Sequence, residues 1–152
     1  ARCKGVADAM GAKGVKSFQL PLPSTSFGDA TAVAEAIKAE ILKDETIDGV
    51  ITISAGDADS AAIGIDQSGR AETIALASFD MNEAGLQRIK DGKQSFAIDQ
   101  QPYLQGYLSV GLLASAIDFG TSLPTFPVLT GPGIVDSSNI DATLAGVQKG
   151  AR

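Results

Sequence analysis

Short β-branched runs alternate along this chain with stretches whose apolar residues recur at helical spacing. Residues 50–53 form a nearly continuous apolar run, which is typical of a strand buried on both faces of a sheet. Before this run, Val33, Ile37 and Ile41 lie on one face of a helix that Asp29 can cap. Strands that alternate with helices in this way predict an α/β fold, with a doubly wound parallel sheet and helices on both of its faces.

The same alternation extends over the whole chain. The expected strands cover residues 15–20, 50–53, 73–78 and 95–98, with extended segments at 127–130 and 133–135. The remaining expected helices cover residues 7–12, 57–66, 82–91, 102–119 and a last stretch that Ser138 or Asn139 caps. We find no internal repeat and no low-complexity tract, so the pattern indicates one α/β unit.

Composition excludes several classes of function. The chain has 152 residues, enough for one domain with a packed core, and a net charge of −6, which would repel nucleic-acid phosphates. Histidine is absent, which excludes Ser-His-Asp and Cys-His catalysis within the chain and the usual zinc sites. Cys3 is the single cysteine, so no intrachain disulfide can form. We therefore expect no enzyme activity, cofactor, metal or nucleic-acid partner.

Polar side chains follow three of the expected strands. In open α/β sheets, ligands bind beyond the carboxyl ends of the strands. Phe79 and Asp80 follow one strand there, and offer a flat apolar face and two acceptor oxygens. Gln100 follows the next strand, and can both donate and accept. Gly56 and Asp57 follow the strand at 50–53, where a glycine lets the backbone approach a ligand closely. Together these groups suit a sugar, which has an apolar C–H face and a hydroxyl edge.

Each of these residues also has a structural interpretation. Phe79 at a strand end can belong to the core, and Gln100 can satisfy loop backbone. Asp80 and Asp57 can each cap the helix that follows them. Asp80 and Asp99 can be imagined as a catalytic carboxylate pair, but only their expected position at the sheet edge supports that idea.

Several segments resemble a known family. Residues 99–108, Asp-Gln-Gln-Pro-Tyr-Leu-Gln-Gly-Tyr-Leu, closely resemble a segment of the sugar-type periplasmic binding proteins of ABC importers. Residues 78–80, Ser-Phe-Asp, and residues 130–136, Thr-Gly-Pro-Gly-Ile-Val-Asp, resemble two further segments of that family. Residues 2–6 look like its Arg-x-x-Gly-Phe motif, with Val6 in place of the aromatic residue. The resemblance covers essentially the whole chain.

That family has two doubly wound lobes joined by a hinge, with the ligand trapped between them. The resemblance implies that Arg2 grips the sugar, that Phe79 stacks on it, and that Asp80 accepts its hydroxyls. It places Gln100 at the last hinge crossing. Gly56 stands where ribose-type members often carry an asparagine, which leaves the identity of the sugar open. The candidate ligand-binding residues are therefore Arg2, Gly56, Asp57, Phe79, Asp80 and Gln100.

The resemblance implies a solute-binding component that delivers a monosaccharide or similar polyhydroxylated molecule to an ABC permease in the inner membrane. Such a protein works in the periplasm and carries out no reaction. The alternative is the sugar-sensing domain of a regulator related to the lactose repressor, which shares the fold and adds a DNA-binding helix-turn-helix. An enzyme on a flavodoxin-like fold is a third possibility, because a fold alone does not exclude chemistry.

The resemblance also implies that residues 1–152 are the C-terminal portion of a two-lobe protein. Residues 1–100 would form the ligand-closing lobe, residues 101–130 would pack on an absent N-terminal lobe, and residues 131–152 would form a tail. Without that lobe, Leu104, Leu108 and Leu112 would form an exposed apolar patch, which soluble proteins generally avoid.

We predict from this patch that the native polypeptide is roughly twice as long as the present chain. Intact-mass spectrometry of the protein from its source measures this directly. A native species with the mass of this chain alone would contradict the prediction.

Overall fold

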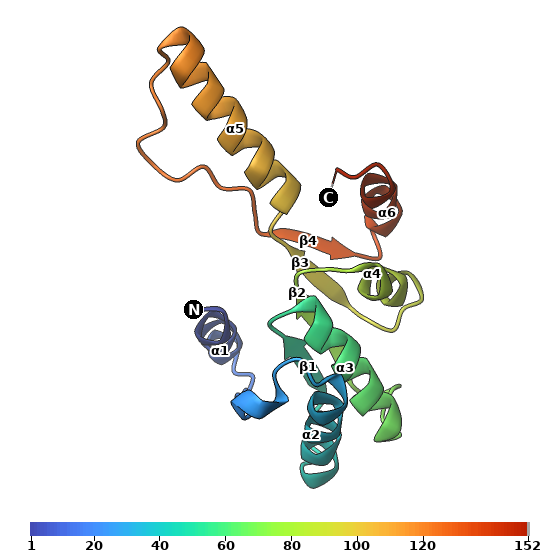
Figure 1. Cartoon of the computed structure of the whole chain (residues 1–152). Coiled ribbons are helices and arrows are strands. Elements are labelled where there is room, and N and C mark those ends of the chain that lie inside the picture. Colours follow the sequence, from blue (N-terminus) through green and yellow to red (C-terminus); the bar gives the residue numbers. More distant parts are fainter. Residues whose placement is uncertain (152) are drawn as a thin grey trace.

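The computed structural model describes residues 1–151, which form a four-stranded mixed sheet with helices packed along it (Figure 1). The strands lie across the sheet in chain order: β1 (Gly49–Thr52), β2 (Ala75–Phe79), β3 (Phe96–Asp99) and β4 (Gly133–Asp136). The first three strands are parallel, and β4 is antiparallel to β3. The α/β prediction is confirmed, and the last strand departs from the parallel arrangement.

The reversal of β4 follows from the path of the chain. After β3 the chain leaves the sheet in a long helix, and it returns to the same edge, where Gly133 pairs with Asp99. A strand that starts beside the end of its neighbour must run in the opposite direction.

Four helices form a layer beside the strands. Contacts run from α2 (Ala30–Lys43) to α3 (Ala55–Gln67), then to α4 (Glu83–Lys90) and to α6 (Ile140–Gln148). The first helix, α1 (Arg2–Ala12), lies on the other side of the strands in Figure 1 and buries none of its residues. A short 3-10 turn, η1 (Ser24–Ser26), precedes α2, and α5 (Pro102–Phe119) projects away from the sheet.

The core consists of two apolar clusters between the helix layer and the sheet. The first cluster lies between α2, α3 and β2, and contains Val33, Ile37, Ile41, Ala61, Ile65, Ile74 and Leu76. The second lies beneath α4 and α6, and contains Leu86, Ile89, Ala97, Val135 and Ile140. The helical spacing of the α2 residues therefore identified their buried face correctly. Asp29 caps this helix as expected, since its carboxylate accepts from the Ala32 N–H at 3.0 Å.

The strand predicted at residues 15–20 is wrong. Residues 15–20 form no strand, and the Val15 N–H donates back to the Met10 carbonyl at the end of α1. The segment 127–130 is also irregular. The run at 50–53 does form most of β1, but it is not buried on both faces, since Val50 and Ile51 are only half-buried and Ile53, just beyond β1, is 46% exposed.

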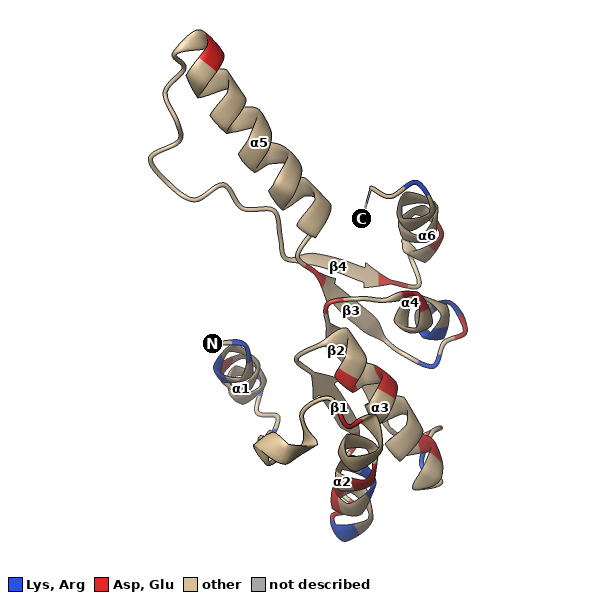
Figure 2. Cartoon of the chain, in the orientation of Figure 1, with Lys and Arg blue, Asp and Glu red and all other residues tan. Residues whose placement is uncertain are grey.

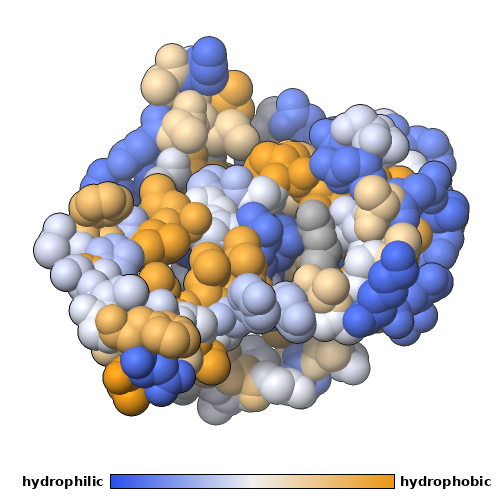
Figure 3. Space-filling model, turned by 90° about the horizontal axis from the view of Figure 1, so that it is seen from above, coloured by the Kyte–Doolittle hydropathy of each residue, from blue (hydrophilic) through white to orange (hydrophobic). Residues whose placement is uncertain are grey.

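The long helix α5 and the segment after it carry much exposed apolar surface. Leu104, Leu108 and Leu112 are half-buried, which corrects the expected patch. The exposed apolar side chains are instead Tyr103, Tyr107, Val110, Leu113, Ile117, Phe119, Leu123, Phe126, Val128 and Leu129. Between residues 100 and 135 the only charged residue is Asp118, and this region is otherwise uncharged in Figure 2. Figure 3 looks onto this end of the molecule, where apolar surface lies between polar areas.

Two carboxylates away from this region stabilise turns. Asp44 accepts from the hydroxyl and the N–H of Thr46, and these hydrogen bonds lower the pKa of Asp44 below its usual value. Asp136 accepts from the hydroxyl and the N–H of Ser138, which lowers the pKa of Asp136 in the same way. Both turns connect a strand with a helix at the surface.

In residues 1–151, no helix has both the length and the apolar character that crossing a membrane requires.

Gly64 lets α2 and α3 approach each other closely. A Cβ at this position would lie 2.6 Å from the Ala34 carbonyl oxygen and 3.3 Å from the Lys38 nitrogen, both of them backbone atoms of α2. We expect Gly64→Ala to lower the free energy of unfolding by about 1–3 kcal/mol, because the two helices must move apart. Urea denaturation measures the change.

Gly111 offers the matched control. It lies inside α5, and nothing lies within 4 Å of a Cβ placed there. Gly111→Ala should therefore be neutral or stabilising by up to about 1 kcal/mol, because alanine favours the helix. Equal effects of the two substitutions would contradict the close contact at Gly64.

Candidate functional site

The guanidinium of Arg2 joins the ends of two strands. Its Nη1 donates to the Ile53 carbonyl just beyond β1 at 2.6 Å, and to Asp80 Oδ2 just beyond β2 at 3.1 Å. The Arg2 Cζ atom also lies 5.1 Å from the centre of the Phe79 ring, which is the geometry of a cation–π contact. The first residue of α1 is thereby held at the carboxyl edge of the sheet.

Asp80 is the centre of this group. Its second carboxylate oxygen accepts from the side-chain amide of Gln100, which follows β3. The backbone of Asp80 is left-handed, with a φ of 61°, a conformation that costs on the order of 1 kcal/mol or more in a residue with a Cβ. The Asp80 N–H donates to the Ile98 carbonyl at 2.9 Å, and the Asp80 carbonyl accepts from the Ser78 hydroxyl at 3.0 Å.

The chain crosses this edge of the sheet once after β3 and again before β4, and hydrogen bonds join the two crossing segments. The Gln100 carbonyl accepts from the Thr130 hydroxyl at 3.0 Å and from the Gln105 side chain at 2.8 Å. Gln101, which is also left-handed with a φ of 56°, donates from its side-chain amide to the Thr130 carbonyl. Gly131 packs so closely that a Cβ there would lie 3.0 Å from the Asp99 carbonyl oxygen. Gln100 therefore lies on a fixed crossing between the sheet and α5.

The loop after β1 has a different organisation. Ser54 caps α3, since its hydroxyl oxygen accepts from the Asp57 N–H at 3.1 Å and its hydroxyl donates to Asp57 Oδ2 at 2.8 Å. Asp57 is thus occupied in a reciprocal helix cap. Gly56, in the first turn of α3, is exposed and has open space beside it. The structure brings Arg2, Phe79, Asp80 and Gln100 together, whereas Asp57 bonds Ser54 and Gly56 borders open space.

Two of the structural interpretations can be decided. Asn82, and not Asp80, caps α4, because the Asn82 Oδ1 accepts from the Gly85 N–H at 2.7 Å. Asp99 is 2% exposed and accepts from the Gln101 N–H at 2.7 Å, whereas Asp80 bonds Arg2 and Gln100. These bonds run to different residues, and the geometry gives no support to a catalytic pair.

The ion pair at the site is accessible to a solute. The side chains of Arg2 and Asp80 are 37% and 36% exposed. A polar ligand can reach both groups, and an ion pair at this level of exposure contributes little stability of its own. Within the described residues 1–151, no group of three potential ligands is placed to hold a metal ion.

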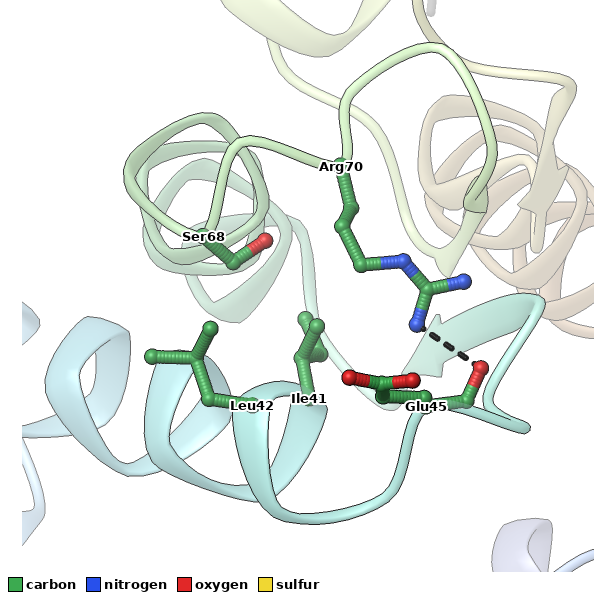
Figure 4. A pocket seen from close by; sticks show the side chains of 5 residues that line it. All are labelled: Ile41, Leu42, Glu45, Ser68 and Arg70. Atoms are coloured by element: carbon green, nitrogen blue, oxygen red, sulfur yellow. Dashed lines mark hydrogen bonds between the residues drawn. The ribbon is translucent and has the colours of Figure 1, made fainter.

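A separate hollow of about 380 Å³ lies at the opposite end of the strands (Figure 4). Its lining includes Ile41, Leu42 and Ser68, and the Arg70 guanidinium donates across it to the Glu45 carbonyl at 3.1 Å. It lies where α2 leads into the start of β1, far along the sheet from the carboxyl ends at which ligands of open α/β sheets bind, so the Arg2–Asp80 group remains the candidate site.

Sequence reasoning found the four side chains of this group but missed two other features. The Ile53 carbonyl is a backbone acceptor, for which no side-chain pattern exists. The polar contacts beneath Asp80, through Ser78, involve residues that look like ordinary strand and loop positions in the sequence.

The sequence profile of the periplasmic binding protein domain family matches residues 1–122, most of the chain. This chain belongs to the periplasmic binding protein domain family. The family is made of solute-binding proteins, and its α/β architecture is the one described above.

Individual relatives bind sugars and polyols. The chain is 36% identical over 81 residues to the xylose/arabinose-binding protein XylF of Sulfolobus acidocaldarius, a match that covers 53% of this chain and 20% of that protein. It is 35% identical to a carbohydrate transporter from Acidothermus cellulolyticus solved with myo-inositol, with a TM-score of 0.72 over 82% of this chain and 43% of the other.

A third relative is an ABC transporter solute-binding protein from Agrobacterium vitis, solved with α-D-tagatopyranose. It is 27% identical, with a TM-score of 0.76 over 93% of this chain and 47% of the other. The chain thus spans less than half the length of these relatives. Because the two solved relatives are a carbohydrate transporter and an ABC transporter solute-binding protein, the interpretation as a sugar-sensing regulator is not favoured.

Proposed function

We propose that this chain forms one side of a cleft that captures a monosaccharide or similar polyol, as part of a solute-binding protein that serves an ABC permease. The observation that carries the proposal is the convergence of Arg2, Phe79, Asp80 and Gln100 at the carboxyl edge of the sheet. These four side chains supply a cation, an aromatic face, a carboxylate and an amide within one group.

The chemistry of this group matches a hydroxylated ring. Asp80 offers acceptor oxygens to two hydroxyls, and Arg2 and Gln100 offer donors to ring or hydroxyl oxygens. The ring of Phe79 offers apolar surface to a C–H face. The relatives with myo-inositol and tagatopyranose support this ligand class. Gly56 adds no side chain to the pocket, so the ligand would make its contacts elsewhere.

No reaction is needed for this role. The site contains one ion pair and one amide, and the chain has no histidine. The binding protein would close on its ligand by a hinge motion, and contacts made only in the closed state would stabilise it. It would act outside the cytoplasmic membrane, where the permease receives the solute.

The other side of the cleft belongs to a second lobe of the same polypeptide in this proposal. Residues 1–100 form the lobe described here together with β4 and α6, which pair with β3 and pack on α4, and residues 101–130 pack against the absent N-terminal lobe. The exposed, almost uncharged surface of α5 and the segment after it supports this, because such a surface favours burial against protein. The free edge of β1 also offers unpaired backbone groups to a further strand.

Removing the central carboxylate should weaken binding of a sugar to the native protein. A thermal-shift screen of myo-inositol, D-xylose, L-arabinose, D-tagatose and D-galactose first identifies a compound that raises Tm. We expect Asp80→Ala to raise the Kd of that compound about thirtyfold, or on the order of 2 kcal/mol, because the donors around the carboxylate lose a charged acceptor. Isothermal titration calorimetry measures the change.

Asp141→Ala is the matched control. Asp141 is also an acidic residue in an ion pair, with Lys90 at 3.0 Å, but it lies on α6 and is 82% exposed. Its removal should leave Kd unchanged. An unaltered Kd in Asp80→Ala, or no stabilising compound among sugars and polyols, would refute the proposed function.

A further inference from the structure

A line of buried polar groups lies beneath Asp80. Gln94 is 3% exposed and Ser78 is 1% exposed. The Gln94 Nε2 donates to the Ser78 hydroxyl oxygen at 3.0 Å and to the Phe96 carbonyl at 3.2 Å, and the Gln94 Oε1 accepts from Arg88 Nε at 3.1 Å. An arginine only donates and a carbonyl only accepts, so the orientation of the Gln94 amide is fixed by its partners.

This orientation gives the line of hydrogen bonds a direction. Because the Ser78 oxygen accepts from Gln94, its own hydrogen is available to the Asp80 carbonyl, which lies at 3.0 Å. At the other end, Arg88 Nη2 donates to Asp59 Oδ1 on α3 at 2.7 Å. Each donor in such a chain polarises the next one, which strengthens the whole. The cationic side chain of Arg88 is thus connected, through the side chains of Gln94 and Ser78, to the backbone carbonyl of Asp80.

The packing of α4 shows how closely this network is enclosed. A Cβ on Gly85 would lie 3.1 Å from Asn82 Oδ1, 3.5 Å from Arg88 Nη2 and 3.8 Å from Gln94 Oε1. Asn82 also donates to Asp59 Oδ2 at 2.7 Å, so both carboxylate oxygens of Asp59 are engaged. The network therefore fills its space with satisfied polar groups.

Asp80 needs such support because its left-handed backbone is disfavoured in a residue with a Cβ. Its N–H is held by the Ile98 carbonyl, and its carbonyl is held by Ser78. If the residue relaxed to an extended conformation, its carboxylate would turn away from Arg2 and Gln100. The hydroxyl of Ser78 therefore contributes to where the carboxylate points.

We propose that Gln94 and Ser78 are positioning residues of the site: the buried amide orients the hydroxyl, and the hydroxyl holds Asp80 in its binding conformation. Neither side chain contacts the ligand in this proposal. It rests on the proposed sugar site for its effect on affinity, but the effect on the backbone of Asp80 is independent of any ligand.

The test uses Gln94→Leu, Ser78→Ala and the double variant in the native protein. Each single change should raise the Kd of the best compound from the sugar panel about tenfold. The double variant should bind no more weakly than the weaker single variant, because both changes break one chain of hydrogen bonds. Backbone couplings and chemical shifts in NMR spectra should show that Asp80 leaves its positive φ.

Val135→Ala separates positioning from stability. Val135 is 1% exposed in the core under α4 and α6, so its truncation lowers stability without touching the network. It should leave both Kd and the φ of Asp80 unchanged. An equal loss of affinity in this control would show that Gln94 and Ser78 act only through stability.

The remaining outcomes are distinct. If Ser78→Ala, the smaller change, folds and keeps both the native Kd and a positive φ at Asp80, the positioning role is overturned. If no panel compound binds the native protein, the proposed function fails, and the NMR measurement still decides the role of Ser78 and Gln94. If the losses of affinity added up in the double variant, this would also contradict the proposal that Gln94 acts on Asp80 through Ser78.

Discussion

The parallel pairing of β1, β2 and β3 is the constraint on which the site depends. Its register sets Thr52 beside Ser78, and Phe79 beside Ile98, so the three strands end at one edge of the sheet. The backbone carbonyl after β1, the carboxylate after β2 and the amide after β3 therefore come within reach of one another. Arg2 spans the first two, and Asp80 connects Arg2 with Gln100.

Local signals in the sequence predicted much of this arrangement. The helix at 102–119 has the expected bounds, because proline suits its first position and Gly120 ends it in a left-handed conformation. The rule that ligands bind at the carboxyl ends of strands predicts Phe79, Asp80 and Gln100 at one edge of the sheet. The resemblance of the first residues to a family motif added Arg2, which no strand rule identifies.

The features that sequence reasoning missed depend on partners far along the chain. Residues 15–20 alternate like a strand, but a strand exists only where a neighbour accepts its hydrogen bonds. The direction of β4 depends on the point at which the segment after α5 rejoins the sheet, beside the end of β3. Gln94 and Ser78 have no distinctive pattern, since burial of a polar side chain is decided by the donors and acceptors that surround it. Asp57 was placed at the correct edge, but its partner Ser54 holds it in a helix cap.

The order of the strands has a consequence for how the molecule is assembled. Each strand pairs with the next one in the chain, so every addition to the sheet closes a comparatively local loop. Such a sheet can grow in step with synthesis from the ribosome, one strand at a time. The contact between Arg2 and Asp80 spans 78 residues, so it forms only after β1 and β2 have been made. The group around Asp80 thus assembles only after the strands that carry it, and before β4 and α6 are added.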